Sequence, residues 1–444
     1  MPIHTGGFGH AEAERLLWRA GFGPRPGDVE ALAAKGLRSA VRSLTRPVGR
    51  ARLDGPAPTV DGAPLAPTDA WGHDHLWWLD RMVRSNQPLV ERMTLNWHDW
   101  FATSRSGVDK AQLMLDQNEM LRRNALGNFG TILTRITVDP AMLLWLSGSD
   151  NNKWAPNENY AREMMELFTL GADRGYTEED VRNQARALTG WRNDWDDGVG
   201  PHHFRYDPKF HDNGAKRIFG RSGRFTWRDS VRLCLEHRNH PSFVVSKLWS
   251  YFIPTPPAPK TAKALAAMYV HGRRAIRPLV EAILMHPAFY TGPRMVKPPV
   301  VYVAGMLRAA GRSIDRDDWA WICDLAGQVL FQPPNVAGWD EQRWLDTATF
   351  RGRWLAANTV LDGLAIDPDE SPAASIEPPE QAVDAAVRFW GGPSVSRATR
   401  DALVRFAADA GALADKKWKI EQYGVLRQNA LRMLVATCPD LQTC

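Results

Sequence analysis

The chain has 444 residues, of which 44% are hydrophobic and 24% are charged, and these values are typical of an ordinary globular protein with a sizeable buried core. Its 55 basic and 50 acidic residues are spread along the chain and give a net charge of +5, so we expect no nucleic-acid partner. No run approaches the roughly 20 consecutive apolar residues that a membrane-spanning helix needs, so we expect no membrane insertion.

Residues 1–11 lack the basic stretch and following apolar segment that mark a signal peptide. As written, the chain is therefore expected to be cytoplasmic, or to be exported only together with a partner. The cysteines form no CxxC pair and show no zinc-like spacing with histidine. We expect free thiols, although Cys438 and Cys444 could close a small loop in an oxidising compartment.

Apolar residues recur at helical spacing almost throughout, and strand-like alternation is nearly absent. The predicted fold is therefore all-α, a large multi-helix globular bundle with long irregular loops. In chain order we expect a helical segment at 1–45, a loop at 46–67, a main helical domain at 68–361, a linker at 362–380 and a C-terminal helical tail at 381–444.

Several helix ends in the main domain carry clear capping residues. Asp139 is a suitable N-cap for one helix, and Asn157 and Gly171 mark the two ends of the next. The stretch Thr177–Asp180 resembles a capping box, which marks the start of a further helix. We expect that helix to form a hairpin with the helix that ends at Gly171. Residues 191–225 show little periodicity and are predicted to be an irregular loop.

The helix between Asn157 and Gly171 carries the densest group of polar side chains. On a helical wheel, one arc holds five of them: Glu158, Asn159, Arg162, Glu163 and Glu166. One interpretation is a surface ladder of ion pairs at i, i+4 spacing. The other is a site in which neighbouring carboxylates raise one pKa and so create a general acid, with Glu158, Glu163 and Glu166 as candidates. The same oxygens suit Ca²⁺, but their spacing matches no known calcium loop, so no cofactor is predicted.

A second candidate cluster is the stretch Trp97-His98-Asp99, to which Asn118 on a later helix is added. His98 offers an imidazole for acid–base chemistry, Asp99 and Asn118 offer polar contacts to a substrate, and Trp97 offers a flat face for a sugar ring. The alternative is that His98 is an ordinary core residue between aromatic rings.

A third candidate cluster is His211-Asp212, which follows the pair His202-His203. Two adjacent histidines in a helix or strand do not easily bind the same metal ion. In a loop, however, His202 or His203 could bind one together with His211 and Asp212. The sequence contains no glycine-rich phosphate loop, GxSxG, HExxH or dinucleotide motif, which argues against nucleotide-dependent enzymes, α/β hydrolases and zincins.

The 19 tryptophans are the one departure from average composition. They fill helical cores in some proteins and stack on sugar rings in others. Trp191 and Trp339, in polar and irregular stretches, are the further candidates for stacking.

The central motifs resemble those of the DUF1800 family, bacterial proteins of unknown function. The resemblance lies in Asn157-Glu158-Asn159-Tyr160-Ala161-Arg162-Glu163 with Glu166-Leu167-Phe168-Thr169-Leu170-Gly171, in Ala187-Leu188-Thr189-Gly190-Trp191, in Phe210-His211-Asp212, and in Pro334-Asn335-Val336-Ala337-Gly338-Trp339. It covers residues 11–358, whereas the tail from about Asp367 is less similar.

The resemblance implies an α-helical architecture and supplies no reaction. Members of this family are often secreted and encoded beside a DUF1501 protein, a relative of alkaline phosphatases or sulfatases, so a DUF1501-type partner is implied. Because the family-like motifs include the polar helix, the His211 loop and the Trp339 loop, we expect them to form one shared site.

The leading hypothesis is a hydrolase or lyase that acts on a carbohydrate polymer. Glu163 or Glu166 would be the general acid, and a second carboxylate would be the base or nucleophile. Arg162 and Asn159 would position hydroxyls or an anionic group, and Trp97, Trp191 or Trp339 would stack on the glycan. One alternative is a non-catalytic partner or maturation factor of a co-encoded exported enzyme. Another is a metal-dependent hydrolase that uses His98, His211, Asp212 and a carboxylate.

Overall fold

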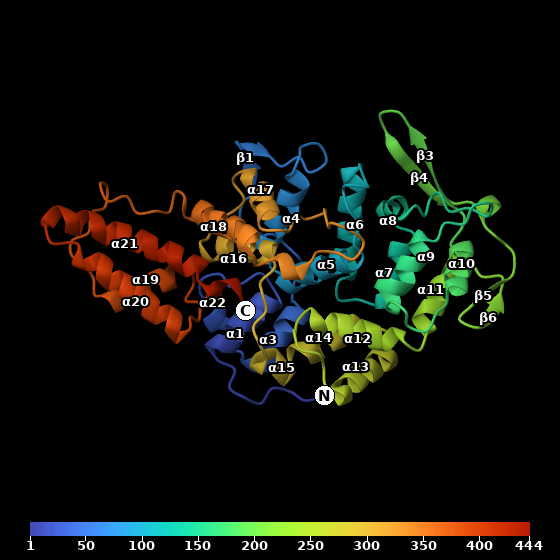
Figure 1. The fold of residues 1–444 in the computed structure, drawn as a ribbon, viewed down its shortest axis with the longest axis horizontal. Coiled ribbons are helices and arrows are strands. Elements are labelled where there is room, and N and C mark those ends of the chain that lie inside the picture. Colours follow the sequence, from blue (N-terminus) through green and yellow to red (C-terminus); the bar gives the residue numbers. More distant parts are fainter.

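The computed structural model describes all residues, 1–444. It contains 22 α-helices and only three short two-stranded sheets, which confirms the predicted all-α class. The molecule is elongated, with the C-terminal helices at one end, the β3–β4 and β5–β6 hairpins at the other, and both termini near the middle (Figure 1).

The N-terminal half is made of short helices and one small hairpin. Its elements up to the polar helix are α1 (His10–Arg19), α2 (Asp28–Ala33), α3 (Gly36–Thr45), β1 (Thr59–Val60), β2 (Ala63–Pro64), α4 (His73–Arg84), α5 (Pro88–Trp100), α6 (Ala111–Asn124), α7 (Phe129–Thr137) and α8 (Pro140–Trp145).

The central elements are α9 (Asn159–Glu163), the π-helical turn η1 (Met164–Thr169), α10 (Glu178–Ala187), β3 (Trp191–Asp196), β4 (Gly200–Tyr206), the 3-10 turn η2 (Pro208–Phe210), β5 (Lys216–Ile218), β6 (Arg221–Gly223), α11 (Trp227–Glu236), α12 (His240–Ser250), α13 (Pro259–His271), α14 (Ile276–Leu284) and α15 (Pro287–Thr291). The last elements are α16 (Pro299–Ala309), α17 (Asp318–Leu325), the 3-10 turn η3 (Glu341–Arg343), α18 (Thr347–Leu361), α19 (Pro379–Phe389), α20 (Arg397–Ala412), α21 (Lys417–Thr437) and α22 (Pro439–Gln442).

Two hydrophobic cores hold these helices together, and α5 contributes to both. Met93, Trp97 and Trp100 of α5 belong to the first core, whereas Leu95 belongs to the second. A helix that is buried on opposite sides leaves little of its surface to water, and so the polar side chains of α5 lie inside the protein. This position makes α5 the centre of the candidate site described below.

The prediction of an irregular loop at 191–225 was wrong. β3 and β4 form an antiparallel hairpin with a register shift between Arg192 and Asp194, and β5 pairs with β6 in a second hairpin. The β3–β4 hairpin extends away from the helices (Figure 1). Because few of its residues are buried, it lacks the apolar alternation by which strands are recognised in a sequence.

The helix predicted from Asn157 to Gly171 is present but is not a regular α-helix. α9 covers only five residues and continues into the π-helical η1. The division of faces is confirmed: Tyr160, Ala161, Met164 and Phe168 are buried. Gly171 ends the helix with φ +93°. Asn157 Oδ1 accepts from the Asn159 amide at 2.9 Å, but the N-cap position is occupied by Glu158, one residue later than predicted.

The other predicted caps are confirmed. The Asp139 carboxylate accepts from the Met142 amide at 3.1 Å. Thr177 and Asp180 form the reciprocal hydrogen bonds of a capping box at the start of α10. None of the four cysteines forms a disulfide bond, so Cys438 and Cys444 do not close a loop.

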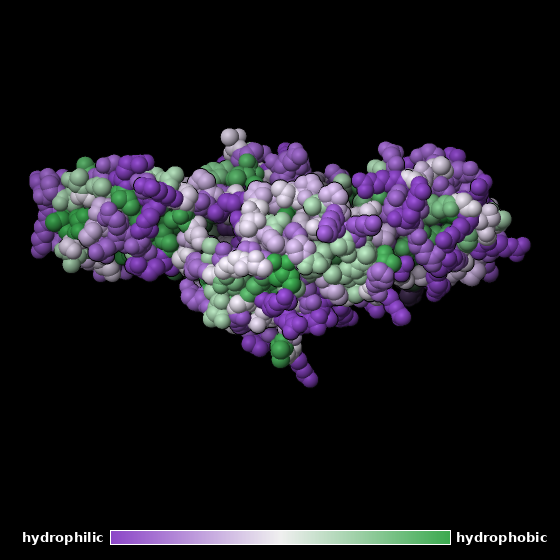
Figure 2. Space-filling view, turned by 90° about the horizontal axis from the view of Figure 1, so that it is seen from below, coloured by the Kyte–Doolittle hydropathy of each residue, from purple (hydrophilic) through white to green (hydrophobic).

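No helix has the length and apolar character needed to cross a bilayer. The face seen in Figure 2 is mostly hydrophilic, and its hydrophobic patches are small and separate.

Candidate functional site

Arg162 organises the polar face of α9 and η1. Its guanidinium donates to Glu158 at 3.1 Å and to Glu166 at 3.3 Å, and it makes two hydrogen bonds, at 2.9 and 2.7 Å, to Glu178 at the start of α10. These contacts raise the pKa of Arg162, the hydrogen bond to Glu178 most of all. The arrangement is the surface ladder expected from the sequence, here called the Arg162 ladder, with an additional rung to α10.

Glu163 lies beside the ladder without joining it. Partial burial raises the pKa of Glu163, the Glu166 carboxylate raises it further, and Arg162 opposes both. Tyr176 lies next to Glu166, and its hydroxyl is buried without a hydrogen-bond partner. Asn159 is exposed. Glu163 is therefore the carboxyl on this helix whose proton affinity is raised.

The π-helical turn directs backbone carbonyls toward α5 and α12. The Leu167 carbonyl accepts from Lys247 Nζ at 3.3 Å, and the Phe168 carbonyl accepts from Trp100 Nε1 at 3.1 Å. Single π-turns inside α-helices are frequent at functional sites. Here the turn links the polar helix to the buried helix α5.

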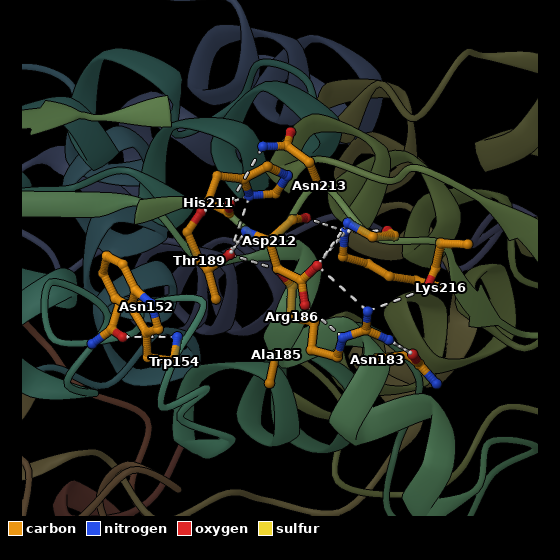
Figure 3. A network of polar contacts seen from close by, with 12 residues as sticks. Asn152, Trp154, Asn183, Ala185, Arg186, Thr189, His211, Asp212, Asn213 and Lys216 are labelled. Atoms are coloured by element: carbon orange, nitrogen blue, oxygen red, sulfur yellow. Dashed lines mark hydrogen bonds and ion pairs between the residues drawn. The ribbon is translucent and has the colours of Figure 1, made fainter. Parts of the chain in front are cut away.

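His211 and Asp212 belong to a closed polar network (Figure 3), here called the Asp212 clamp. The Asp212 carboxylate accepts from Arg186 Nε at 2.7 Å, and its amide donates to Thr189 Oγ1 at 2.9 Å. His211 Nδ1 lies 3.0 Å from the Thr189 carbonyl, to which it donates. The Lys216 ammonium, whose side chain is fully buried, donates to the carbonyls of Asp212 and Gly214.

The clamp satisfies its charges internally. Arg186, Lys216 and the Gly214 amide hold the pKa of Asp212 below its usual value, against the burial that raises it. A carboxylate with its lone pairs engaged in this way has little capacity left for a metal or a substrate. The clamp fastens the chain between β4 and β5 to α10.

Removing the carboxylate of the clamp is expected to destabilise the protein. Asp212→Ala leaves Lys216 buried and Arg186 half-buried without their anion, and breaking a buried pair in this way costs about 3 kcal/mol. Urea unfolding measures the loss. Glu236→Ala, which removes the exposed partner of Arg221 and Arg232, is the matched control, and an equal loss in both variants would contradict a structural clamp.

His98 is enclosed among aromatic rings. Trp78, Phe331 and Trp339 lie with ring centroids 5.3, 5.6 and 5.6 Å from the imidazole. Both ring nitrogens are buried without a hydrogen-bond partner, and burial lowers the pKa of His98 to about 3. The expectation that His98 performs acid–base chemistry is therefore corrected, because the ring is neutral and does not reach solvent.

Burial of a neutral histidine makes stability depend on pH. Since the unfolded His98 has a pKa near 6.5, the unfolded state binds one more proton than the folded state between about pH 6.5 and pH 3, and the contribution of this residue falls as pH is lowered. Over this range the contribution of His98 to the free energy of unfolding changes by about 1.4 kcal/mol per pH unit. In His98→Phe the free energy of unfolding should fall less steeply from pH 6.5 to lower pH; urea titrations at several pH values measure it, and unchanged slopes would oppose the assignment.

The tryptophans proposed as sugar platforms are not free to stack. Trp97 is fully buried and donates to the Ala125 carbonyl at 2.8 Å. Trp339 is buried against His98, and Trp191 packs on Tyr206 and Trp227. The indoles that face solvent are others: Trp71, Trp154 and Trp195 are 77%, 69% and 64% exposed.

Asp99 lies at the C-terminal end of α5 and is partly exposed. Its Oδ1 accepts from the Trp339 amide at 2.9 Å. Burial raises the pKa of Asp99 to about 7; the Trp339 amide and the Lys247 charge lower it, and the Glu341 charge raises it. Asp99 is thus a carboxyl that exchanges its proton near neutral pH.

Lys247 on α12 lies near enough to Asp99 for their charges to interact. Burial lowers the pKa of Lys247 to about 8, and the Asp99 carboxylate counteracts this. The ammonium lies 4.7 Å from the Trp100 ring centroid. Glu341, which is exposed at the start of η3 but whose pKa is raised by desolvation from the neighbouring chain, completes the titratable groups around Asp99.

Unsatisfied donors surround these groups. Arg92 is buried on the same face of α5 as Asp99, seven residues away, and its Nε and Nη1 lack partners although the guanidinium lies 5.1 Å from the Tyr251 ring centroid. The Asn96 amide nitrogen and Trp339 Nε1 are also buried without partners. Buried polar atoms are normally satisfied, so unsatisfied ones indicate a place for water or a ligand. We call Arg92, Asn96, Asp99, Lys247, Trp339 and Glu341 the Asp99 cluster.

The side chains of the three sequence-predicted clusters are not joined to one another by hydrogen bonds or ion pairs. His98, Asp99 and Trp339 are in contact, but no hydrogen bond or ion pair joins their side chains to those of the Arg162 ladder or the Asp212 clamp. Asn118 is buried and accepts from Arg122. The sequence therefore predicted Asp99 together with one of its contacts, Trp339.

Lys247, Arg92 and Glu341 were missed. Lys247 lies between Phe243 and Tyr251 at i−4 and i+4 of α12. A lysine flanked in this way by aromatic residues on one helical face is a signal that the sequence did contain. The approach of Glu341 to α5 depends on tertiary structure alone.

The predicted convergence of His98, His211 and Asp212 on a metal is not seen. The one group of three candidate ligands whose donor atoms all lie within 4.8 Å of one another is Asp194, His202 and His203 on the β3–β4 hairpin. His203 has φ +49°, so the backbone departs from a regular strand there. Asp194 is already paired with Arg205 at 2.9 Å.

The comparisons with known proteins gave one match. The sequence profile of DUF1800, described as a protein of unknown function, matches residues 15–443. No curated protein and no solved structure matches the chain. The match includes the C-terminal tail, beyond the region in which the motifs were recognised, and the chain therefore belongs to the DUF1800 family.

Proposed function

We propose that this protein is a hydrolase acting on a carbohydrate polymer and that its acid–base centre is the Asp99 cluster. The observation that carries the proposal is the carboxyl of Asp99, with a pKa of about 7, beside a second carboxyl, Glu341, whose pKa is also raised. Glycoside hydrolysis usually pairs one carboxyl that is protonated because its pKa is raised with a second that acts as an ionised carboxylate.

In this proposal Asp99 protonates the glycosidic oxygen and Glu341 acts as base or nucleophile. The exposed indoles of Trp71, Trp154 and Trp195 offer faces on which single sugar rings can stack. The sequence-based assignment of the acid to Glu163 or Glu166 is the competing location, since Glu163 also has a raised pKa.

Two matched variants distinguish these locations. The purified protein is incubated with a panel of soluble and insoluble glycans, with reducing ends as the readout for hydrolysis and ultraviolet absorbance of an unsaturated product as the readout for elimination. On a glycan that is cleaved, Glu341→Gln is expected to lower turnover at least about 100-fold, whereas Glu166→Gln retains it. The opposite result places the centre on the polar helix, and elimination products would replace hydrolase by lyase.

A second candidate function is that of a non-catalytic partner or maturation factor of a DUF1501-type enzyme. The observation that favours it is the β3–β4 hairpin, which extends from the body and presents Trp195 with 64% of its surface exposed (Figure 1). Exposed aromatic residues are common at protein interfaces. Co-expression with a neighbouring DUF1501 protein should give co-purification that Trp195→Ala weakens, and no activity on the glycan panel.

A further inference from the structure

A cavity away from the Asp99 cluster is rich in arginine. It has a volume of about 750 Å³ and is lined by the ends of α3, α4 and α6, the start of α5 and the chain at 46–53. Its lining contains six arginines and two glutamates: Arg46, Arg52, Arg81, Arg122, Arg123, Arg277, Glu91 and Glu119. Cavities of this size accommodate small organic ligands.

The segment that forms one wall of this cavity is held in place by its backbone. The Arg52 amide donates to Asn86 Oδ1 at 2.9 Å, and the Asn86 amide donates to the Arg52 carbonyl at 3.1 Å. The Asp54 amide donates to the Arg84 carbonyl at 3.0 Å. The cavity is thus a fixed part of the fold, although the wall lies in the region predicted to be a loop.

Four of the six arginines are neutralised within the protein. Arg122 makes hydrogen bonds of 2.7 and 3.0 Å to Glu91, and both Arg122 and Arg123 bind Glu119. In addition, Arg46 is paired with Glu281, and Arg52 with Asp54. Arg81 and Arg277 are the two that make no ion pair, although the charges of Glu91 and Glu119 act on Arg81 and that of Glu281 acts on Arg277.

Arg81 is oriented but unpaired. Its guanidinium lies 4.5 Å from the Trp77 ring centroid, and Arg122 lies 5.4 Å from the same centroid. Its Nε is buried without a partner, and the side chain makes none of the hydrogen bonds or ion pairs that its neighbours Arg84 and Arg122 make. A planar guanidinium that is held by an aromatic ring and retains free donors is suited to bind an oxyanion.

We propose that this cavity is a binding site for the oxyanion group of a small organic ligand, such as a phosphate or carboxylate, with Arg81 as the principal contact and Arg277 at the rim. The site is separate from the proposed acid–base centre, and the two proposals stand or fall independently. Gln87, which also lines the cavity, offers a neutral side-chain donor and acceptor for the rest of the ligand.

The test is thermal stabilisation of the full chain by three probes: glucose 6-phosphate, glucuronate and inorganic phosphate, with uncharged glucose as control. A ligand that binds only the folded state raises Tm with its concentration. We expect saturable stabilisation by glucose 6-phosphate or glucuronate and none by glucose. Stabilisation by glucose 6-phosphate would identify a phosphate ligand, and stabilisation by glucuronate a carboxylate ligand. Stabilisation by inorganic phosphate alone would contradict the proposal that the ligand is organic.

Variants assign the effect to the cavity. Arg81→Gln is expected to weaken binding at least about 10-fold, as expected for loss of a hydrogen bond to a charged group, and Arg277→Gln to weaken it by a smaller factor. Arg397→Gln, which alters an arginine 95% exposed and far along the chain, should bind as the wild type does. Because Arg81 makes no hydrogen bond or ion pair in the free protein, its replacement removes only the contact with Trp77, and the Tm without ligand should change little. Binding that is insensitive to both Arg81→Gln and Arg277→Gln, or stabilisation by none of the probes, would overturn the proposal.

Discussion

Asp99→Asn is expected to lower turnover on a cleaved glycan by about 10³-fold, the usual contribution of a general acid, while leaving Tm nearly unchanged. Asparagine keeps the oxygen that accepts from the Trp339 amide, so the structural contact survives and only the exchangeable proton is lost. A residue that served only to hold the Trp339 loop would tolerate this change.

The pH profile adds a second readout for the same residue. A general acid must be protonated, and the pKa of Asp99 is about 7, so activity is expected to be high below pH 7 and to decline as pH rises through 7. Asp197→Asn, an exposed change in the β3–β4 turn, is the control for loss of one carboxylate. If Asp99→Asn kept wild-type turnover and an unchanged pH profile, Asp99 would not be the general acid.

Gly338→Ala is expected to destabilise the protein by about 3 kcal/mol and to disrupt the Asp99 cluster. Gly338 has φ +96°, which costs an alanine roughly 1 kcal/mol, and an added Cβ would lie 2.3 Å from Asp99 Oδ1 and 2.8 Å from the Asp99 carbonyl oxygen. Those contacts cannot be accommodated unless the loop or the carboxylate moves. Activity should therefore fall together with stability.

Gly311→Ala separates the effect of backbone strain from the effect of the contact with Asp99. Gly311 has φ +66°, but nothing lies within 4 Å of its added Cβ, so this variant suffers only the backbone strain. Urea unfolding should show the larger loss at position 338, and turnover should fall only there. Equal losses in both variants would mean that the contact with Asp99 has no role.

Local features of the fold were predictable from the sequence. The caps at Asp139 and Thr177 and the left-handed Gly171 depend on a few neighbouring residues, and all three are present. The β3–β4 hairpin was not predictable, because its strands are mostly solvated and its charged residues interrupt the apolar pattern. The π-turn in η1 was missed for a related reason: it follows an apolar pattern that fits a regular α-helix equally well.

The candidate site was predicted only where its residues are close in sequence or carry a family motif. Asp99 and Trp339 were both named, and the structure joins them through one hydrogen bond. Lys247 and Glu341 come from other elements, so that only packing of α12 and η3 against α5 brings their charges to Asp99. The acid–base role predicted for His98 failed because a histidine beside tryptophans looks the same in sequence whether it faces a ligand or the core.

The π-turn of η1 constrains the length of the chain more than its composition. A π-turn holds one residue more than the corresponding α-helical turn, and that residue sets the rotation between Arg162 and the carbonyls of Leu167 and Phe168, which bind Lys247 and Trp100. Loss or gain of a single residue between Arg162 and Gly171 would rotate one end of the helix by about 100° relative to the other. Inserting or deleting one residue in this segment is therefore expected to break the contacts with Lys247 and Trp100.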